Sequence, residues 1–254
     1  MAREVMIVVP CYNEEKRLDT GTFKTFAGLH DNVGFLFVND GSTDNTASVL
    51  EDLHYSDPCS FLAHHLPANA GKAEAVRQGI LKAMELSPAH VGYWDADLAT
   101  PLEEIPNLCR VLETMGHVQA VFGSRVMLLG RSIRRSSLRH YLGRLFATTV
   151  SFVLGLQVYD TQCGAKLFRA SEEVRELFDE PFQSTWIFDV EIIARWIRAR
   201  ANGDLAPVSE IIYEIPLAQW HGKAGSKIDA LAYARSAVEL VGICRRYVFS
   251  ARPR

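Results

Sequence analysis

Strand-like apolar runs alternate with helical segments through the first half of the chain, and this alternation restricts the fold more than any other feature. Val5–Val9 is an uninterrupted apolar run that ends at Pro10, which cannot donate a hydrogen bond within a sheet. Similar runs cover residues 35–38, 60–64 and 90–94, and each is followed by a segment of helical character. The pattern predicts an α/β fold with a doubly wound, mostly parallel mixed sheet flanked by helices.

The loops after the first two strands contain residues that commonly begin helices. Asn13 is a suitable N-cap for a first helix, with Glu14 and Glu15 in its first turn. Ser42 or Thr43 is a suitable cap for the second helix. Further helices are expected at 73–85, 103–115, 186–200 and 228–248, and further strands at 119–122, within 160–168 and at 211–215.

Two carboxylates follow the fourth apolar run directly. Asp95 and Asp97 are expected at the carboxyl end of a buried strand, where ligands collect in open α/β sheets. Tyr12, Glu14 and Asp40 follow the first two strands and are expected along the same edge. A carboxylate pair placed there can hold a divalent cation together with diphosphate oxygens. The pair by itself also fits a solvated acidic turn before a helix. The polar residues that follow the first two strands favour the interpretation as a binding site.

The sequence argues against two common nucleotide-binding loops. Gly71-Lys72 resembles the end of a P-loop, but Leu66 stands where that loop needs a glycine, and Ala73 where it needs serine or threonine. No Gly-x-Gly-x-x-Gly turn follows the first strand, which disfavours a dinucleotide-binding Rossmann domain. The five cysteines lack Cys-x-x-Cys spacing, so they predict neither a zinc site nor a disulfide framework, and a reducing cytoplasm is expected.

Charge is distributed unevenly along the chain. The formal net charge of −3 argues against a nucleic-acid-binding protein. Residues 114–159 contain no acid, and this window holds six arginines: Arg125, Arg131, Arg134, Arg135, Arg139 and Arg144. Residues 131–157 are expected to form a helical stretch with a basic start and an apolar remainder, and its apolar run, 145–156, is too short to span a bilayer. Such a stretch fits the surface of an anionic membrane and fits equally a core helix with a basic edge.

Several motifs together resemble the family 2 glycosyltransferases, which have a GT-A fold and bind nucleotide sugars. They are Val9-Pro10-Cys11-Tyr12-Asn13-Glu14-Glu15, Val38-Asn39-Asp40-Gly41-Ser42-Thr43-Asp44, Asn69-Ala70-Gly71-Lys72 and Asp95-Ala96-Asp97. Three later motifs are similar to the dolichyl-phosphate glucosyltransferase branch, namely residues 160–168, Phe188-Asp189-Val190-Glu191 and Gly225-Ser226-Lys227. The resemblance covers nearly the whole chain, and the order and spacing of the motifs make it specific.

The resemblance implies roles for individual residues. It assigns nucleoside binding to Pro10, Tyr12, Glu14, Val38 and Asp40. It adds Lys72, Ala96 and the late Lys227 to the donor site, and it places Mg²⁺ or Mn²⁺ on Asp95 and Asp97. Arg125 is expected to face the phosphates, and Asp189 to position the acceptor. The basic residues Arg131, Arg134, Arg135 and Arg139 are expected to face the acceptor or the membrane.

Two departures from the family pattern affect specificity. Asn39 stands where many members have a second aspartate, which bears on base selectivity. Ala99 stands where the mannosyl relatives have a metal-ligating glutamine, which favours glucose over mannose. The eukaryotic glucosyl enzymes also have an amino-terminal membrane helix, whereas here Met1–Glu4 leads directly into the first strand. Membrane contact would therefore depend on residues 131–157.

The implied reaction is an inverting attack by a polyprenyl phosphate oxygen on the anomeric carbon of UDP-glucose. We expect one domain over residues 1–254, with a nucleotide-sugar-binding half at 1–125 and an acceptor- and membrane-facing half at 126–254. The expected location is the cytoplasm, peripherally on the cytoplasmic face of a membrane. Two alternatives stay open: a family 2 enzyme acting on a soluble saccharide or protein, and a non-catalytic nucleotide-sugar-binding subunit.

Overall fold

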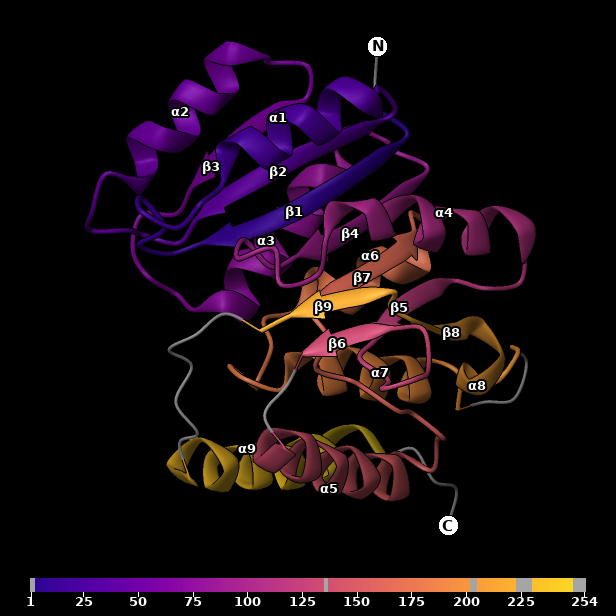
Figure 1. Ribbon diagram of the computed structural model, residues 1–254. Helices are drawn as coiled ribbons and strands as arrows, with labels where there is room; N and C mark the ends of the chain where they lie inside the picture. Colours follow the sequence, from indigo (N-terminus) through magenta and orange to yellow (C-terminus); the bar gives the residue numbers. More distant parts are fainter. Residues whose placement is uncertain (1–2, 135–136, 202–204, 223–229, 249–254) are drawn as a thin grey trace.

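A seven-stranded mixed sheet forms the centre of the computed structural model, which describes residues 3–134, 137–201, 205–222 and 230–248 (Figure 1). The strand order is β3-β2-β1-β4-β7-β5-β8. The strands are β1 (Val5–Cys11), β2 (Val33–Asn39), β3 (Phe61–His65), β4 (His90–Trp94), β5 (Ala120–Ser124), β7 (Ala165–Arg169) and β8 (Ile212–Pro216). Only β7 runs antiparallel to its neighbours in this sheet, β4 and β5. The predicted α/β class and the mostly parallel mixed sheet are therefore confirmed.

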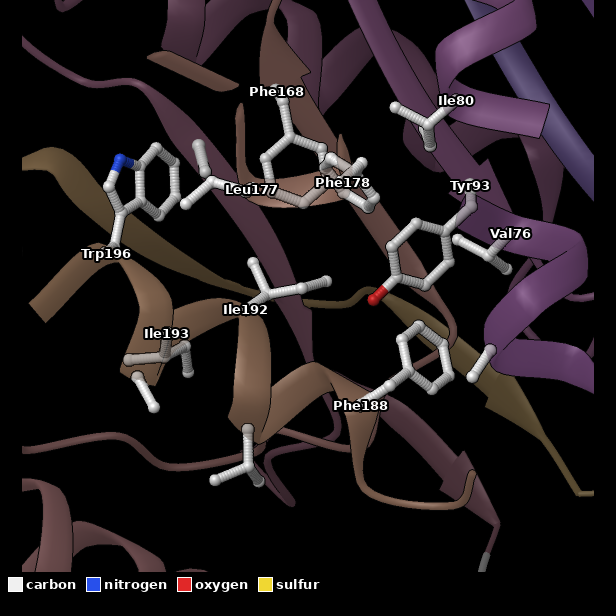
Figure 2. Close-up of a cluster of buried hydrophobic side chains, with 14 of the residues drawn as sticks. Val76, Ile80, Tyr93, Phe168, Leu177, Phe178, Phe188, Ile192, Ile193 and Trp196 are labelled. Atoms are coloured by element: carbon white, nitrogen blue, oxygen red, sulfur yellow. The ribbon is translucent and has the colours of Figure 1, made fainter. Parts of the chain in front are cut away.

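Helices cover both faces of the sheet, because the strands bury side chains on both sides. Val5, Ile7 and Val9 of β1 belong to one hydrophobic cluster, whereas Met6 and Val8 belong to the other. The first cluster is covered by α1 (Thr20–Leu29), α2 (Thr46–Ser56) and α4 (Ile105–Thr114), which follows a 3₁₀ turn at Leu102–Glu104. The second is covered by α3 (Lys72–Met84), α6 (Glu172–Asp179) and α7 (Phe188–Ala199). In Figure 2, Val76 and Ile80 of α3 lie beside Tyr93 of β4 in this second core.

The remaining elements extend the α7 side of the molecule. They are α5 (Ser137–Leu154), the short α8 (Val208–Ile211) and α9 (Ala230–Ile243), which continues into a π-helical turn at Cys244–Val248. Val150 of α5 and Leu240 of α9 are buried in the same hydrophobic cluster as α7. In Figure 1, α5 and α9 lie beyond α7, on the side away from α1 and α2.

The predicted N-caps of the first two helices are wrong. Asn13 has φ of 53° and lies in a loop, and α1 begins only at Thr20, capped by the Asp19 side chain. Glu14 and Glu15 therefore do not lie in a first helical turn. The Asn13 backbone N–H donates to the Ser42 hydroxyl at 3.0 Å, and the Thr43 N–H donates to Asn13 Oδ1 at 2.9 Å. These side chains tie two loops together instead of capping helices.

The expected continuous helix over 131–157 is interrupted at its start. Residues Ser132–Arg134 form a short strand, β6, which pairs in parallel with β9 (Gln219–His221). The Ser132 N–H donates to the Ala218 carbonyl at 2.9 Å, so this backbone satisfies its hydrogen bonds with β9 rather than within a helix. The helix begins at Ser137.

Candidate functional site

A cavity of about 250 Å³ opens at the carboxyl ends of β1, β2 and β4. Its walls come from three loops and the start of α3, as expected where parallel strands end together. The lining residues are Pro10, Cys11, Tyr12, Glu14, Arg17, Asp40, Lys72, Ala75, Asp95, Ala96 and Asp97. The structure thus brings together most of the residues that the sequence assigns to the donor. Cys11, Arg17 and Ala75 also line the cavity, although the sequence assigned none of them to the site.

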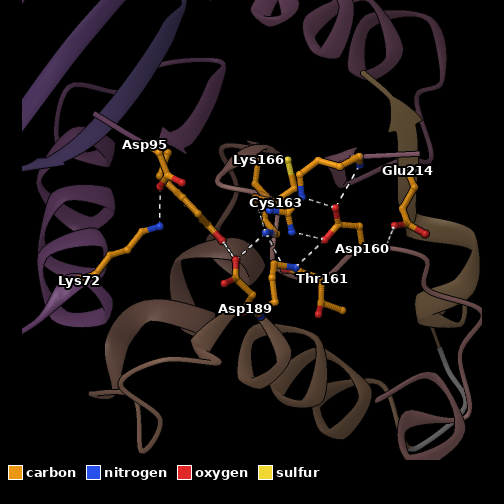
Figure 3. Close-up of polar contacts among 11 residues, drawn as sticks. Lys72, Asp95, Asp160, Thr161, Cys163, Lys166, Asp189 and Glu214 are labelled. Carbon is orange, nitrogen blue, oxygen red and sulfur yellow. Dashed lines mark hydrogen bonds and ion pairs between the residues drawn. The ribbon is translucent and has the colours of Figure 1, made fainter. Parts of the chain in front are cut away.

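Asp95 and Asp97 form the acidic wall of this cavity, beside Lys72. The Lys72 ammonium lies 2.5 Å from Asp95 Oδ1 (Figure 3). Partial desolvation of the ammonium opposes the charged form of Lys72, whose side chain is 44% exposed, but the negative charges of Asp95, Asp189 and Asp97 raise the pKa of Lys72 above its ordinary value. Asp97 Oδ1 accepts the Ala99 N–H at 2.9 Å, and this bond shapes the turn after the pair. The site therefore holds opposite charges at close range before any ligand binds.

Gly164 lies directly against the Asp95 carboxylate. Because β7 pairs with β4, the loop before β7 meets the end of β4, and the Asp95 N–H donates to the Gly164 carbonyl at 3.0 Å. A Cβ added at Gly164 would lie 1.9 Å from Asp95 Oδ2. Glycine is therefore required here for a close approach. The sequence contained this residue within the 160–168 motif but gave no indication of its contact.

Asp40 holds the loop that precedes Lys72. Its Oδ1 accepts the Ala70 N–H at 2.7 Å, and its Oδ2 accepts the Gly71 N–H at 2.9 Å. The Asn69 amide also donates to Asp40 Oδ2, at 3.1 Å. The carboxylate therefore fixes the start of α3 and, through it, the base of the Lys72 side chain.

Glu14 is a second buried acid of the cavity, beside Asp40. Arg17 donates to Glu14 Oε1 at 2.5 Å, whereas Glu14 Oε2 is buried and has no hydrogen-bond partner among the described atoms. Burial raises the pKa of Glu14, with smaller contributions from Asp97 and Asp44, and Arg17 opposes this rise. An unpartnered buried acceptor of this kind can accept a hydrogen bond from a ligand hydroxyl.

Arg125 follows β5 and makes a bidentate ion pair with Asp160 instead of lining the cavity. Its Nε lies 2.6 Å from Asp160 Oδ2, and its Nη2 lies 2.7 Å from Asp160 Oδ1. Burial opposes the charged form, but the charge and hydrogen bonds of Asp160 raise the pKa of Arg125. Glu214 of β8 accepts the backbone N–H groups of Tyr159 and Asp160 at 2.7 and 2.8 Å, and so holds this aspartate in place (Figure 3).

Asp189 is half of a buried ion pair. The Lys166 ammonium, which is completely buried, lies 2.5 Å from Asp189 Oδ1 and also donates to the carbonyls of Thr161 and Cys163 (Figure 3). The Tyr93 hydroxyl donates to the same Asp189 oxygen. Burial, together with the Asp189 charge and hydrogen bond, raises the pKa of Tyr93 well above its ordinary value. Lys166 was missed because a lysine in a sequence indicates a solvated side chain.

The small β6–β9 sheet adjoins the acidic loop. The His221 N–H of β9 donates to the Ala99 carbonyl at 2.8 Å. Glu104, which is buried, accepts the Ala218 N–H at 2.6 Å and so fixes the approach to β9. Trp220 lies between these contacts, and the centre of its ring is 5.4 Å from the Arg125 guanidinium carbon. The sequence predicted only a basic loop here.

Some predicted site residues do not reach the cavity or cannot be placed. Val38 is completely buried in the hydrophobic core. Arg131, which was predicted for the acceptor or membrane face, is exposed just before β6. Lys227 and Arg135 lie outside the described residues, and the side chains of Arg134 and Arg139 are likewise outside the description.

A second hollow, of about 320 Å³, lies along the end of α5 and contains no acid in its lining. Its lining residues are Arg144, Thr148, Ser151, Phe152, Gly155, Leu156, Gln157 and Val158. The Arg144 guanidinium carbon lies 3.7 Å from the centre of the Tyr159 ring, and the guanidinium donates to the Tyr159 carbonyl. Its charge is therefore already in contact with Tyr159. This hollow lacks the opposed charges that distinguish the cavity at the sheet edge.

Comparisons with known proteins agree with this arrangement. The model of glycosyl transferase family 2 matches residues 6–174. A dolichyl-phosphate beta-glucosyltransferase of Trichomonas vaginalis is 33% identical over 248 residues, covering 93% of this chain and 69% of the relative. The dolichyl-phosphate beta-glucosyltransferase of Saccharomyces cerevisiae is 31% identical, with 91% and 72% covered. The human enzyme of the same name is 29% identical, with 98% and 77% covered.

Solved structures with the same fold include glucosyl-3-phosphoglycerate synthase from Mycobacterium tuberculosis. Its complex with phosphoglyceric acid superposes with a TM-score of 0.69 at 20% identity, covering 96% of this chain and 80% of that chain. Its complex with Mn²⁺ and UDP-glucose gives the same TM-score and identity. This similarity confirms the predicted GT-A fold. From its sequence and its fold together, the chain belongs to glycosyl transferase family 2, close to the dolichyl-phosphate beta-glucosyltransferases.

Proposed function

We propose that this protein transfers glucose from UDP-glucose to a polyprenyl phosphate of the dolichyl type, with inversion at the anomeric carbon. The observation that carries the proposal is the convergence of Asp95, Asp97, Asp40 and Glu14 on one cavity beside the Lys72 ammonium. The names of the relatives support the glucose and the lipid phosphate. The UDP-glucose complex of the structural neighbour supports a UDP-sugar donor.

On the donor side, we assign the nucleoside to the wall formed by Pro10, Tyr12, Glu14 and Asp40. The unpartnered Glu14 Oε2 is a suitable acceptor for a ribose hydroxyl. Tyr12 has 44% of its surface exposed at the cavity, so its ring is available for stacking on a base. Lys72 is placed to contact the diphosphate, because it already balances the charge of Asp95 in the same cavity.

The acidic pair fits a divalent cation that is held jointly with the diphosphate. Within the part of the chain that the structure describes, no group of three or more His, Cys, Asp or Glu side chains could enclose a metal ion alone. Asp95 and Asp97 therefore supply at most part of a coordination shell, which is how Mg²⁺ is commonly bound beside substrate phosphates. Bound there, Mg²⁺ or Mn²⁺ would neutralise the charge that develops on the departing diphosphate.

The acceptor is better explained as a phosphate than as a hydroxyl. A hydroxyl nucleophile needs a general base, and Asp189 is the acid that the sequence places on the acceptor side. In the structure its Oδ1 is occupied by the Lys166 ammonium and the Tyr93 hydroxyl, so Asp189 is poorly suited to removing a proton. A phosphate is already ionised near neutral pH and needs no such base. This contact favours the lipid phosphate over the soluble saccharide or protein acceptor.

The α5 and α9 helices offer a surface suited to a membrane. Tyr141, Leu145 and Phe152 of α5 are 71%, 67% and 87% exposed, and their spacing places them along one side of the helix. Val238 and Val241 of α9 are 74% and 59% exposed. We propose that these side chains enter the interfacial region of a membrane that contains the acceptor, while the basic residues predicted for this role, Arg131, Arg134, Arg135 and Arg139, contact anionic headgroups.

In the described part of the chain, no helix combines the length and the apolar character needed to cross a bilayer.

The test is a transfer assay with purified protein and vesicles. Radiolabelled UDP-glucose should yield a glucosyl lipid with polyprenyl phosphate and none with the unphosphorylated polyprenol, and UDP-glucose should outcompete GDP-mannose. Transfer to a soluble sugar alone would support the second enzymatic alternative, and tight UDP binding without transfer to any acceptor would support the non-catalytic subunit.

Vesicle co-sedimentation separates the membrane role from folding. Leu145→Glu or Phe152→Glu should weaken binding to phosphatidylglycerol vesicles without lowering the melting temperature, because both side chains are exposed. Val150→Ala, on the same helix but buried, should lower the melting temperature instead. Unchanged vesicle binding of both glutamate variants would contradict the proposed membrane surface.

A further inference from the structure

A chain of hydrogen bonds connects the outer edge of the sheet to the wall of the cavity. Asn39 and His65 end the neighbouring strands β2 and β3 and are partners in the parallel register. The Asn39 amide nitrogen lies 3.0 Å from His65 Nδ1, and His65 Nε2 lies 2.8 Å from Glu51 Oε1 of α2. On its other side, Asn39 Oδ1 accepts the Ser42 N–H at 3.0 Å.

These contacts determine the protonation pattern of the imidazole. The Ser42 backbone N–H can only donate, so the Asn39 atom that faces it is the carbonyl oxygen. The Asn39 amide group must then donate to His65, and Nδ1 must be an unprotonated acceptor. His65 is therefore neutral with its proton on Nε2, which donates to Glu51.

The turn fixed by Asn39 supports two walls of the cavity. The Ser42 hydroxyl accepts the Asn13 N–H at 3.0 Å, and Asn13 stands between the cavity residues Tyr12 and Glu14 with a left-handed backbone. Gly41, with φ of 61°, presses against the backbone of residues 68–69, where an added Cβ would lie 2.4 Å away. A shift of this turn would therefore reach the loops on both sides.

We propose that His65 is a positioning residue of the donor site, whose neutral Nε2–H form holds the Asn39 amide and thereby the Gly41–Ser42 turn. The inference rests on the proposed function only in that UDP affinity is used to measure the effect of His65 on the donor site. Protonation of Nδ1 places two donors against each other, so the Asn39–His65 bond is lost, or the amide turns and the Ser42 bond is lost. The Glu51 carboxylate faces Nε2 of the ring, and the Asn39 amide faces Nδ1.

Asn39→Asp should reverse the way in which the Gly41–Ser42 turn depends on the protonation of His65. An aspartate keeps an acceptor for the Ser42 N–H, but its second oxygen faces Nδ1 and requires a proton there. Protonated His65 would then bridge two carboxylates, an arrangement that the wild-type amide forbids. The variant should hold the turn when His65 is charged, whereas the wild type holds it when His65 is neutral.

The experiment is nitrogen-15 NMR of the histidine rings, followed by UDP titration at several pH values. At about pH 8 the wild-type His65 signals should be those of the Nε2–H tautomer. In Asn39→Asp, His65 should protonate at a pH at least about one unit higher, as expected when a carboxylate replaces a donor. The Nδ1–H tautomer in the wild type, or equal titration in both proteins, would overturn the proposal.

The binding measurement relates His65 to the donor site. UDP affinity of the wild type should fall several-fold more between about pH 8 and pH 5.5 than that of Asn39→Asp. His64→Gln, which changes the preceding residue of the same strand, should follow the wild type. Equal pH dependence in the wild type and Asn39→Asp would overturn the coupling. Failure of the wild type to bind UDP at about pH 8 would contradict the proposed function, while the NMR result would still decide the role of His65.

Discussion

Replacing Gly164 by alanine should separate activity from stability. The new Cβ would lie 1.9 Å from Asp95 Oδ2 and 2.1 Å from its Cγ. To reach an ordinary contact of about 3.4 Å, the carboxylate must withdraw by about 1.5 Å, which removes it from its place beside Lys72. A misplacement of about 1 Å in a reacting site costs on the order of 10²-fold in rate, or about 2.7 kcal/mol of transition-state stabilisation.

The stability of the same variant should change little. The Asp95 side chain is 34% exposed, so it can turn toward solvent, and losing its ion pair with Lys72 costs at most about 1 kcal/mol. Alanine in place of glycine restricts the unfolded chain and returns about 0.4–1 kcal/mol, because Gly164 does not have a positive φ. The melting temperature should therefore stay within about 4 °C of the wild type.

Steady-state kinetics with UDP-glucose and polyprenyl phosphate, together with thermal unfolding, measures both quantities. Gly28→Ala is the matched control, since Gly28 lies in α1 with open space around its Cβ position, and this variant should keep full activity. Wild-type kcat/KM in Gly164→Ala would refute the argued contact with Asp95. A large loss of melting temperature together with activity would show that the glycine serves the fold rather than the site.

Three further perturbations test the buried groups. Lys166→Met should lower the free energy of unfolding, measured by urea denaturation, by about 3–5 kcal/mol, because it leaves Asp189 buried without its cation. An unchanged urea midpoint would contradict the argument that this ion pair is buried and needed for stability. Alkylation of the native protein at about pH 7.5 should label the exposed Cys59 and spare Cys163, whose pKa is raised to about 11 by burial, and peptide mass spectrometry reads the outcome. Because the pKa of Glu14 is raised in the folded state, the free energy of unfolding falls as the pH rises from about 4.5 through the folded pKa. Glu14→Gln should therefore have a higher melting temperature than the wild type at pH 7 and lose that advantage toward pH 4. A constant difference in melting temperature across this range would contradict the raised pKa.

The cavity could be predicted because it depends on a general property of parallel sheets. Asp40 and Asp95 follow two strands that the apolar pattern reveals, and the carboxyl ends of parallel strands lie at one edge. Tyr12 and Glu14 follow a third strand at the same edge. Local patterns were therefore sufficient for the sheet class and for the main walls of the cavity.

The remaining contacts depend on strand order, which local patterns do not specify. The insertion of β7 between β4 and β5 brings Gly164 to Asp95 and buries Lys166 beside Asp189, although these residues are far apart in the sequence. The three-residue strand β6 gives no periodic signal. Asn13 has the composition of a helix cap, but its backbone and side chain bind another loop.

Calorimetric titration of the protein with UDP, with Mn²⁺ or with EDTA, tests the proposed donor site most directly. The convergence of Asp95 and Asp97 on the cavity predicts that the metal strengthens UDP binding. Asp97→Asn should remove most of that gain while the protein keeps its melting temperature, because Asp97 lies at the surface of the cavity rather than in the core. Equal UDP affinity in Mn²⁺ and EDTA, together with unchanged affinity in Asp97→Asn, would contradict the account.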